Sequence, residues 1–441
     1  MKRPPRLADD HGQRGPEHPV RPRPYGGAGV ADEAQVRKAT RAVYIAFAGG
    51  GFAYASWASR IPQIRAELRV TPGTLGLILL CGAIGSGTAT PLSGLVVGRI
   101  GEARAVVVMS LTSAAGLATI AVGYSRVAAV ATGLFFFGFG SGAWDVAMNV
   151  QGAAVERGHD RAIMPKFHAG WSLGTVAGAG AGAAMVALGV PVTAHLLAVA
   201  LAVSVAVPAA TRGFLPRGSA RLDETVARHG RGSRRGRGPR RGGDPERGPM
   251  RGQLAAWTER RTLLIGLFVL CMAFSEGTGN DWLSLSVIDG YHIAAFLGDL
   301  VFAVFLTAMT AGRWFGPRLI DRYGRVAALR ASAATALAGL LLVVFGVVLP
   351  VAAAGAALMG LGTALGFPVG MSAAADDPRY AAARVSTTAS LGYLAFLAGP
   401  PTIGFLADQV GVLHALSAAG VLIALAFFLS PAAAPITPGL D

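Results

Sequence analysis

The chain has 441 residues, of which 53% are hydrophobic and only 14% are charged. Water-soluble domains carry about 25% charged residues, so this composition argues against a soluble globular protein and for one embedded in lipid. The two cysteines lie inside apolar runs and no residues show metal-ligand spacing, so we expect no disulfide framework, no metal site and no cofactor.

The net charge of +15 is carried mainly by two polar segments. Residues 212–261 contain 14 arginines and five acids, and residues 1–41 contain nine basic residues and five acids. Basic segments that flank apolar spans orient membrane proteins and contact anionic lipid headgroups. RNA binding by the Arg/Gly-rich stretch is the alternative, but the placement of the charges favours lipid, so we expect no nucleic-acid partner.

Apolar runs of about 20 residues, the length that spans a bilayer as a helix, recur along the chain. We predict 12 transmembrane helices, at 41–59, 74–97, 103–123, 127–154, 168–189, 192–211, 261–288, 294–314, 326–348, 351–374, 386–407 and 411–430. The predicted organisation is a disordered basic tail (1–40), a six-helix bundle (41–211), a disordered Arg/Gly-rich loop (212–260), a second six-helix bundle (261–430) and a short tail (431–441).

The basic residues also predict the orientation. With an even number of spans and a cytoplasmic N-terminus, 35 of the 39 Lys and Arg residues fall on the cytoplasmic side or at inner helix ends. The exceptions are Arg60, Arg65, Arg69 and Arg126. Positively charged loops stay inside, so both termini are expected in the cytoplasm of a bacterial cell, with the chain in the inner membrane.

Two short motifs repeat at similar offsets. GRIG at 98–101 resembles DRYG at 321–324, and SLG at 172–174 recurs at 390–392. The first pair follows the second span of each half, and the second pair lies in the fifth span. An all-α membrane fold of two pseudo-symmetric six-helix bundles follows, with a solute site expected between them near the middle of the bilayer.

The first span contains Ser56 and Trp57, which lie on or beside a polar face. Sugars and aromatic solutes often stack on such a tryptophan. A structural role in helix packing is the alternative.

The fourth span contains an acid, Asp145, far from any other charge. Asn149 is four residues on and shares its helical face with small and polar residues. A charge inside the bilayer costs about 2.5–3.5 kcal/mol on insertion scales, so such acids are often functional. We expect Asp145 to bind a proton or a cationic or hydroxylated ligand; an interhelical hydrogen bond that only stabilises the bundle is the alternative.

The seventh span contains a second polar cluster in FSEGTGNDWLSLSV, residues 274–287. Glu276 and Asn280 lie one turn apart, and Asp281 lies roughly 8 Å further along the helix at 1.5 Å per residue. Neighbouring glycines weaken this helix, as in transporter binding sites. Alternatively, Asp281 lies at the outer interface, with Trp282 as an aromatic anchor.

The loops after the second and eighth spans are candidate gates. Arg99 and Gly101 occupy the first loop, and Asp321, Arg322, Gly324 and Arg325 occupy the second. Asp321 and Arg322 are placed to pair with helix ends and with Arg325, which would hold one conformation of the two bundles. Orientation of the chain alone would also explain the basic residues.

Five segments in order resemble the major facilitator superfamily, within it the YbjJ-like inner-membrane branch and, distantly, the fucose permeases. These are FAYASWASRIPQI (52–64), DVAMNVQG (145–152), FHAGWSLG (167–174), AGRWFGPRLIDRYGR (311–325) and GYLAFLAGPPTIGFLA (392–407). The resemblance implies alternating access around a cavity lined by spans one, four, seven and ten. Two departures stand out: Gly98 replaces the acid of the first loop motif, and the first span has no acid between Arg41 and Ser59. The second departure argues against fucose as the solute.

We therefore expect a monomeric secondary active transporter that moves a small polar solute, with proton coupling through Asp145 or Glu276. Proton-coupled multidrug efflux is the first alternative, although GTVAGAGAGAAM (174–185) lacks the proline that efflux relatives share. A transporter-like sensor or scaffold that uses the Arg-rich loop is the second. No HExxH motif, P-loop or Ser/His/Asp grouping points to an enzyme.

Overall fold

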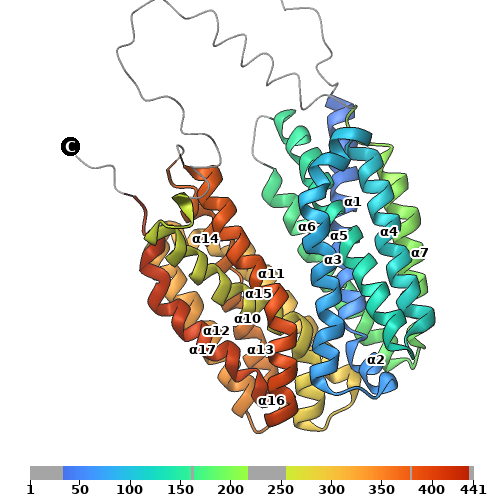
Figure 1. The fold of residues 1–441 in the computed structure, drawn as a ribbon, viewed down its shortest axis with the longest axis vertical. Coiled ribbons are helices and arrows are strands. Elements are labelled where there is room, and N and C mark those ends of the chain that lie inside the picture. The colour runs from blue at the N-terminus through green and yellow to red at the C-terminus, as the bar shows by residue number, and fades with distance from the viewer. Residues whose placement is uncertain (1–32, 160–162, 217–254, 378–379, 437–441) are drawn as a thin grey trace, which may run out of the picture.

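The computed structural model describes residues 33–159, 163–216, 255–377 and 380–436, and throughout these residues the regular structure is helical. The predicted tail up to residue 32 and the predicted loop at 217–254 lie outside the described residues. Figure 1 shows two bundles side by side, one from each half of the chain.

The first bundle begins at Glu33, inside the segment predicted as a tail. Its helices are α1 (Glu33–Ala58), the short α2 (Ile61–Leu68), α3 (Pro72–Ile100), α4 (Glu102–Gly123), α5 (Val127–Arg157), α6 (Met164–Ala187) and α7 (Val192–Thr211). Close approach explains much of the glycine content. Gly138 of α5 lies directly against the backbone carbonyl of Gly82 in α3, and Gly51 of α1 lies against the backbone of Trp171 in α6, where no side chain would fit.

The second bundle repeats this arrangement with two interrupted helices. It comprises α10 (Arg260–Tyr291), α11 (Ala295–Tyr323), α12 (Arg325–Phe345), α13 (Leu349–Thr363), α14 (Gly366–Ala374), α15 (Ala381–Val410), α16 (Val412–Ala415), α17 (Ser417–Leu429) and the 3-10 turn η1 (Ser430–Ala433). The tenth predicted span is interrupted between α13 and α14. Pro368 is the third residue of α14, where the first N–H groups have no partner within the helix, so its missing N–H costs no hydrogen bond.

Ten helices or helix pairs among the described residues are long and apolar enough to cross a membrane. The two predicted spans outside this set are α1 and α6, which are rich in glycine and begin with polar turns. They are 26 and 24 residues long and pack against each other within the first bundle. The all-α membrane fold is confirmed, and the count of twelve spans stays a prediction for α1 and α6.

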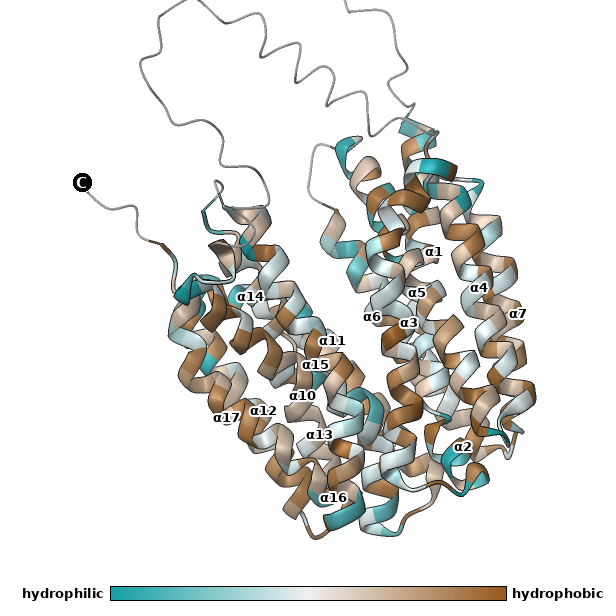
Figure 2. Cartoon of the chain, viewed as in Figure 1, coloured by the Kyte–Doolittle hydropathy of each residue, from teal (hydrophilic) through white to brown (hydrophobic). Residues whose placement is uncertain are grey.

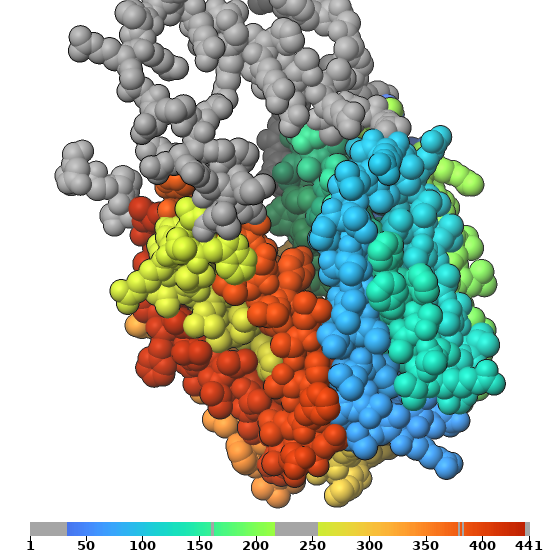
Figure 3. Space-filling model, viewed as in Figure 1, coloured from blue at the N-terminus to red at the C-terminus, as the bar shows by residue number. Residues whose placement is uncertain are grey.

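The two bundles meet at one end and separate at the other. We call the end that holds the start of α1, the end of α7 and the start of α10 the open end, and the opposite end, near α2 and α16, the closed end (Figure 1). Hydrophilic residues gather at both ends, with a more apolar band between them (Figure 2). The space-filling view is hollowed between α3 and α15 toward the open end (Figure 3).

Specific contacts join the bundles at the closed end. Asp408 at the end of α15 accepts a hydrogen bond from the backbone N–H of Gly73 at 3.1 Å, in the first turn of α3. Gly76 lies against the carbonyl of Pro400, so the two helices touch backbone to backbone. Arg65 of α2 forms an ion pair with Asp289 of α10 at 2.5 Å. These contacts close one end of the space in which the predicted site residues lie.

Candidate functional site

Asp145 lies on the one exposed face of its turn of α5. The side chains of Trp144 and Ala143 behind it are buried, whereas Asp145 itself is exposed. Asn149, one turn on, donates its amide N–H to the Asp145 carboxylate at 3.1 Å and to the Asp145 backbone oxygen at 2.8 Å. The two side chains share one face of α5, as their spacing predicts, and the hydrogen bond between them is a further finding.

This face of α5 points toward the second bundle. The carboxylate of Asp145 interacts electrostatically with the hydroxyl of Tyr393 in α15, which is 51% exposed. None of the ion pairs between described residues involves Asp145. Its immediate partner is thus a neutral amide on its own helix, and no cation fixes its charge.

Glu276 of α10 has a strong partner that the sequence analysis missed. The guanidinium of Arg313 in α11 donates to its carboxylate at 2.6 Å. The Glu276 side chain is 14% exposed and that of Arg313 31%, while Nε of Arg313 is buried with no hydrogen-bond partner among the described residues. The pair is neutral overall, and among the described residues the Nε–H of Arg313 remains an unused hydrogen-bond donor.

Asp281 faces the first bundle. Its carboxylate interacts with the hydroxyl of Tyr54 in α1. The charge of Glu276 also acts electrostatically on that hydroxyl. The side-chain oxygen of Asn280 is buried without a hydrogen-bond partner among the described residues. Trp282 is fully buried, so the alternative that it anchors Asp281 at the outer interface is wrong. The polar cluster of α10 therefore faces Tyr54 across the gap between the bundles.

The two candidates in the first span do not line the hollow in this conformation. Ser56 is fully buried and Trp57 is 4% exposed, within the core of the first bundle. The Ser56 hydroxyl oxygen has no partner among the described residues. Trp57 thus packs here as in the alternative interpretation, and a stacking role for it stays a prediction.

The two candidate gating loops share one backbone conformation. Gly101 has φ 83° and ψ 162°, and Gly324 has φ 81° and ψ 161°, values that only glycine adopts readily. Each is the single residue between two helices. Gly411 has φ 81° and ψ 154° in the related stretch DQVG, residues 408–411, which the sequence analysis did not recognise.

The side chains of the second loop differ from the expected pairing. Arg325 donates to Asp376, at 2.8 and 3.0 Å to its two carboxylate oxygens, and not to Asp321. Asp321 is exposed, as is Arg322, whose guanidinium lies 5.2 Å from the ring centroid of Tyr323. Arg99 lies in the last turn of α3, at the corresponding place in the first bundle. In this conformation Arg325 stabilises the second bundle through a contact within that bundle.

Some of the missed residues left a signal in the sequence. Arg313 falls within the predicted eighth span, and a charge inside a span is the same clue that singled out Asp145. Asp408 begins a DxxG stretch like that of Asp321. Tyr54 and Tyr393 left none, because a tyrosine in an apolar helix is unremarkable until its neighbours are known.

The sequence was compared with known protein families. The Major Facilitator Superfamily profile matches residues 43–386. The chain belongs to the major facilitator superfamily. Membership makes it a multi-pass membrane protein and a solute transporter. The YbjJ-like branch and the distant link to fucose permeases stay predictions.

Two bacterial relatives align with this superfamily member over most of their length. An uncharacterized MFS-type transporter of Yersinia pestis is 30% identical over 382 residues, which cover 86% of this chain and 91% of the relative. The uncharacterized transporter y4wD of Sinorhizobium fredii is 29% identical over 394 residues, which cover 89% of this chain and 97% of the relative.

Solved structures of the superfamily share the fold. The nucleoside transporter NupG superposes with a TM-score of 0.68 at 13% identity, covering 90% of this chain and 98% of NupG. A bacterial homologue of the human lysosomal transporter Spinster, in an inward-facing and unoccupied conformation, gives a TM-score of 0.63 at 12% identity, with coverages of 93% and 100%. At these identities the likeness extends to the fold alone.

Proposed function

We propose that this transporter is a secondary active carrier of a small polar solute in the bacterial inner membrane, coupled to protons through Asp145. The observation that carries the proposal is the setting of Asp145: an exposed acid on a membrane helix, facing the opposite bundle, with no cation of the described residues paired to it.

Alternating access follows from the asymmetry of the two ends. The contacts of Asp408 and Arg65 close one end, while the bundles separate at the other. The described ends of the basic segments, residues 33–41, 212–216 and 255–261, lie at the open end, so under the positive-inside rule this conformation is inward-open. To open the other way, the bundles must rock and break the closed-end contacts.

The neighbours of each acid decide between the two proton-binding candidates. Glu276 has a guanidinium at 2.6 Å, so its negative charge already has an opposite charge beside it. Asp145 has an amide partner only, so when the bundles close around it the carboxylate loses water without gaining a cation. A proton or a cationic solute then has to neutralise it. We assign the proton to Asp145 and solute contacts to Asn149, Asn280, Asp281 and the Glu276–Arg313 pair.

The polar groups lining the gap indicate the solute class. Carboxylates, amides and the hydroxyls of Tyr54 and Tyr393 hydrogen-bond well to a polar molecule with several donors and acceptors. We therefore expect a small polar solute rather than an apolar drug, which favours uptake over the efflux alternative.

Proteoliposomes test the proposal. A thermal-shift screen of a metabolite library with the purified chain would first identify a solute, whose uptake is then measured with and without an imposed pH gradient. Asp145→Asn is expected to abolish gradient-driven accumulation while solute exchange at equal pH persists. Gradient-driven accumulation by the Asp145→Asn protein at the unmodified rate would refute proton coupling through this residue.

A further inference from the structure

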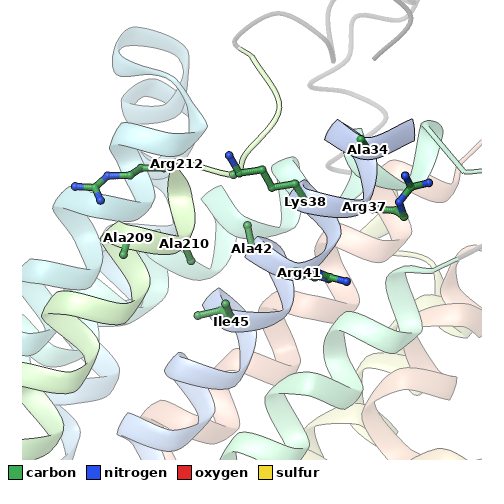
Figure 4. Close-up of a pocket in the computed structure, with 10 residues that line it drawn as sticks. Ala34, Arg37, Lys38, Arg41, Ala42, Ile45, Ala209, Ala210 and Arg212 are labelled. Atoms are coloured by element: carbon green, nitrogen blue, oxygen red, sulfur yellow. The ribbon is translucent and has the colours of Figure 1, made fainter. Parts of the chain in front are cut away.

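A groove lies on the surface of the first bundle at the open end, between the start of α1 and the end of α7. Its rim carries four cations: Arg37, Lys38 and Arg41 from α1 and Arg212 from α7. Figure 4 shows Ala42 and Ile45 further along α1 from the basic side chains, with Ala209 and Ala210 on α7 opposite them. The groove is therefore basic at the rim and apolar along its floor.

The groove lies where the membrane surface is expected. After Arg41, α1 has no charged residue up to its end at Ala58, and α7 has none before Arg212. Arg41 in α1 and Arg212 directly after α7 therefore lie at the same end of the two uncharged runs. Basic side chains at that level reach the headgroup layer, while the runs beyond them lie in hydrocarbon.

An exposed apolar track continues from the groove into that hydrocarbon region. Val205 and Leu201 precede Ala209 at four-residue intervals on one face of α7, and they are 61% and 66% exposed. Ile45 of α1 is 45% exposed beside them. A free anion such as phosphate would use the rim alone, whereas a lipid would also cover this track.

Among the described residues, most of the positive charge of the groove has no acidic partner. Glu33 pairs with Arg37 at 3.0 Å, but this pair is 90% and 62% exposed, so it contributes little. We infer that this groove binds the headgroup of an anionic phospholipid, with its phosphate at the basic rim and an acyl chain along the apolar track. A lipid so placed contacts both α1 and α7 and holds their ends together.

The second bundle provides an internal comparison. A related groove lies between the start of α10 and the segment after α17, lined by Arg260, Arg261, Leu264 and residues 431–436. There Arg261 is already engaged, by Asp376 at 3.0 Å and the carbonyl of Ala434 at 2.8 Å. Arg260 is left to attract an anion, so this groove should bind an anionic lipid more weakly.

Native mass spectrometry of the full-length chain in detergent tests the inference by titration with palmitoyl-oleoyl phosphatidylglycerol. The test variant is Lys38→Gln, Arg41→Gln, Arg212→Gln. The matched control is Arg104→Gln, Arg157→Gln, Arg318→Gln, which removes the same charge from the same end of the protein, at exposed residues that line neither groove. Each basic residue near an anionic surface strengthens binding, so the groove variant should raise the dissociation constant at least about tenfold and the control less than about threefold.

Several outcomes would overturn the inference. Equal weakening in both variants would indicate diffuse charge attraction, and no weakening in either would remove the site. Displacement of the lipid by 10 mM inorganic phosphate would assign the rim to free anions. Should the triple groove variant fail to fold, the single Lys38→Gln and Arg212→Gln variants test the same site, each with an expected weakening of about threefold and a null result from both being decisive against it.

Discussion

The two bundles repeat the same backbone but give the acids beside the gap different partners. In the first, Asp145 is held by Asn149 of its own helix and faces Tyr393 across the gap. In the second, Glu276 is paired with Arg313 of a neighbouring helix. The first acid has a neutral amide as its partner, and the second has an opposite charge beside it. Pseudo-symmetry thus extends to the helices and their connections and not to the chemistry of the site.

The largest expected effect separates the roles of these two acids. Asp145→Asn should lower the ratio of uptake with a pH gradient to uptake without one by more than about tenfold, because a neutral amide cannot release a proton. The double variant Glu276→Gln, Arg313→Gln should keep that ratio within about threefold, even where its solute affinity falls. Proteoliposome uptake measures both, and the reverse result would assign proton coupling to the second bundle.

The next effect concerns stability. Arg313→Gln alone should lower the free energy of unfolding by about 2–4 kcal/mol, since it leaves a buried carboxylate unpaired. Adding Glu276→Gln should recover most of that loss. Asn149→Ala removes the corresponding partner of Asp145 and should cost about 1 kcal/mol, because Asp145 is exposed. Thermal unfolding in one detergent supplies the three values, and a large loss for Asn149→Ala would remove the contrast between the bundles.

The shared backbone predicts equal effects in the two halves. Gly101→Ala and Gly324→Ala should each cost about 1–3 kcal/mol, because both positions have a φ near +80° with an extended ψ. Gly98→Ala is the matched control. Gly98 is a helical residue with open space at the position that a Cβ would occupy, so alanine should be neutral or slightly stabilising there. Clearly unequal costs at Gly101 and Gly324 would show that the halves differ in their connections too.

The smallest expected effect lies at the closed end. Asp408→Asn removes a negative charge that lies beside the first turn of α3. That charge stabilises the closed contact by about 0.3–1 kcal/mol. The population with this end open should rise by about twofold to fivefold. Labelling rates at a cysteine introduced at Thr74, in a background without Cys81 and Cys271, measure that population. An unchanged rate would mean that backbone packing around Gly76 alone keeps the bundles together.

The parts of this site that the sequence could predict are those with local causes. Asp145 was identifiable because one charge in an apolar run is costly wherever the helix packs, and its pairing with Asn149 follows from helical spacing. The partner of Glu276 was not, since Arg313 lies 37 residues away and only helix packing brings the two together. For the same reason the burial of Trp57 could not be read from its helical face.

The single glycines that connect neighbouring helices also determine how the rocking of the two bundles can be observed. Gly101 joins α3 to α4 and Gly324 joins α11 to α12, and no other residue separates the helices of either pair. Each hairpin must therefore move as a single body. A spin-label pair with one label on α4 and one on α12, at the periphery and away from the solute path, should report the full rocking of both halves without touching a residue that binds solute or protons.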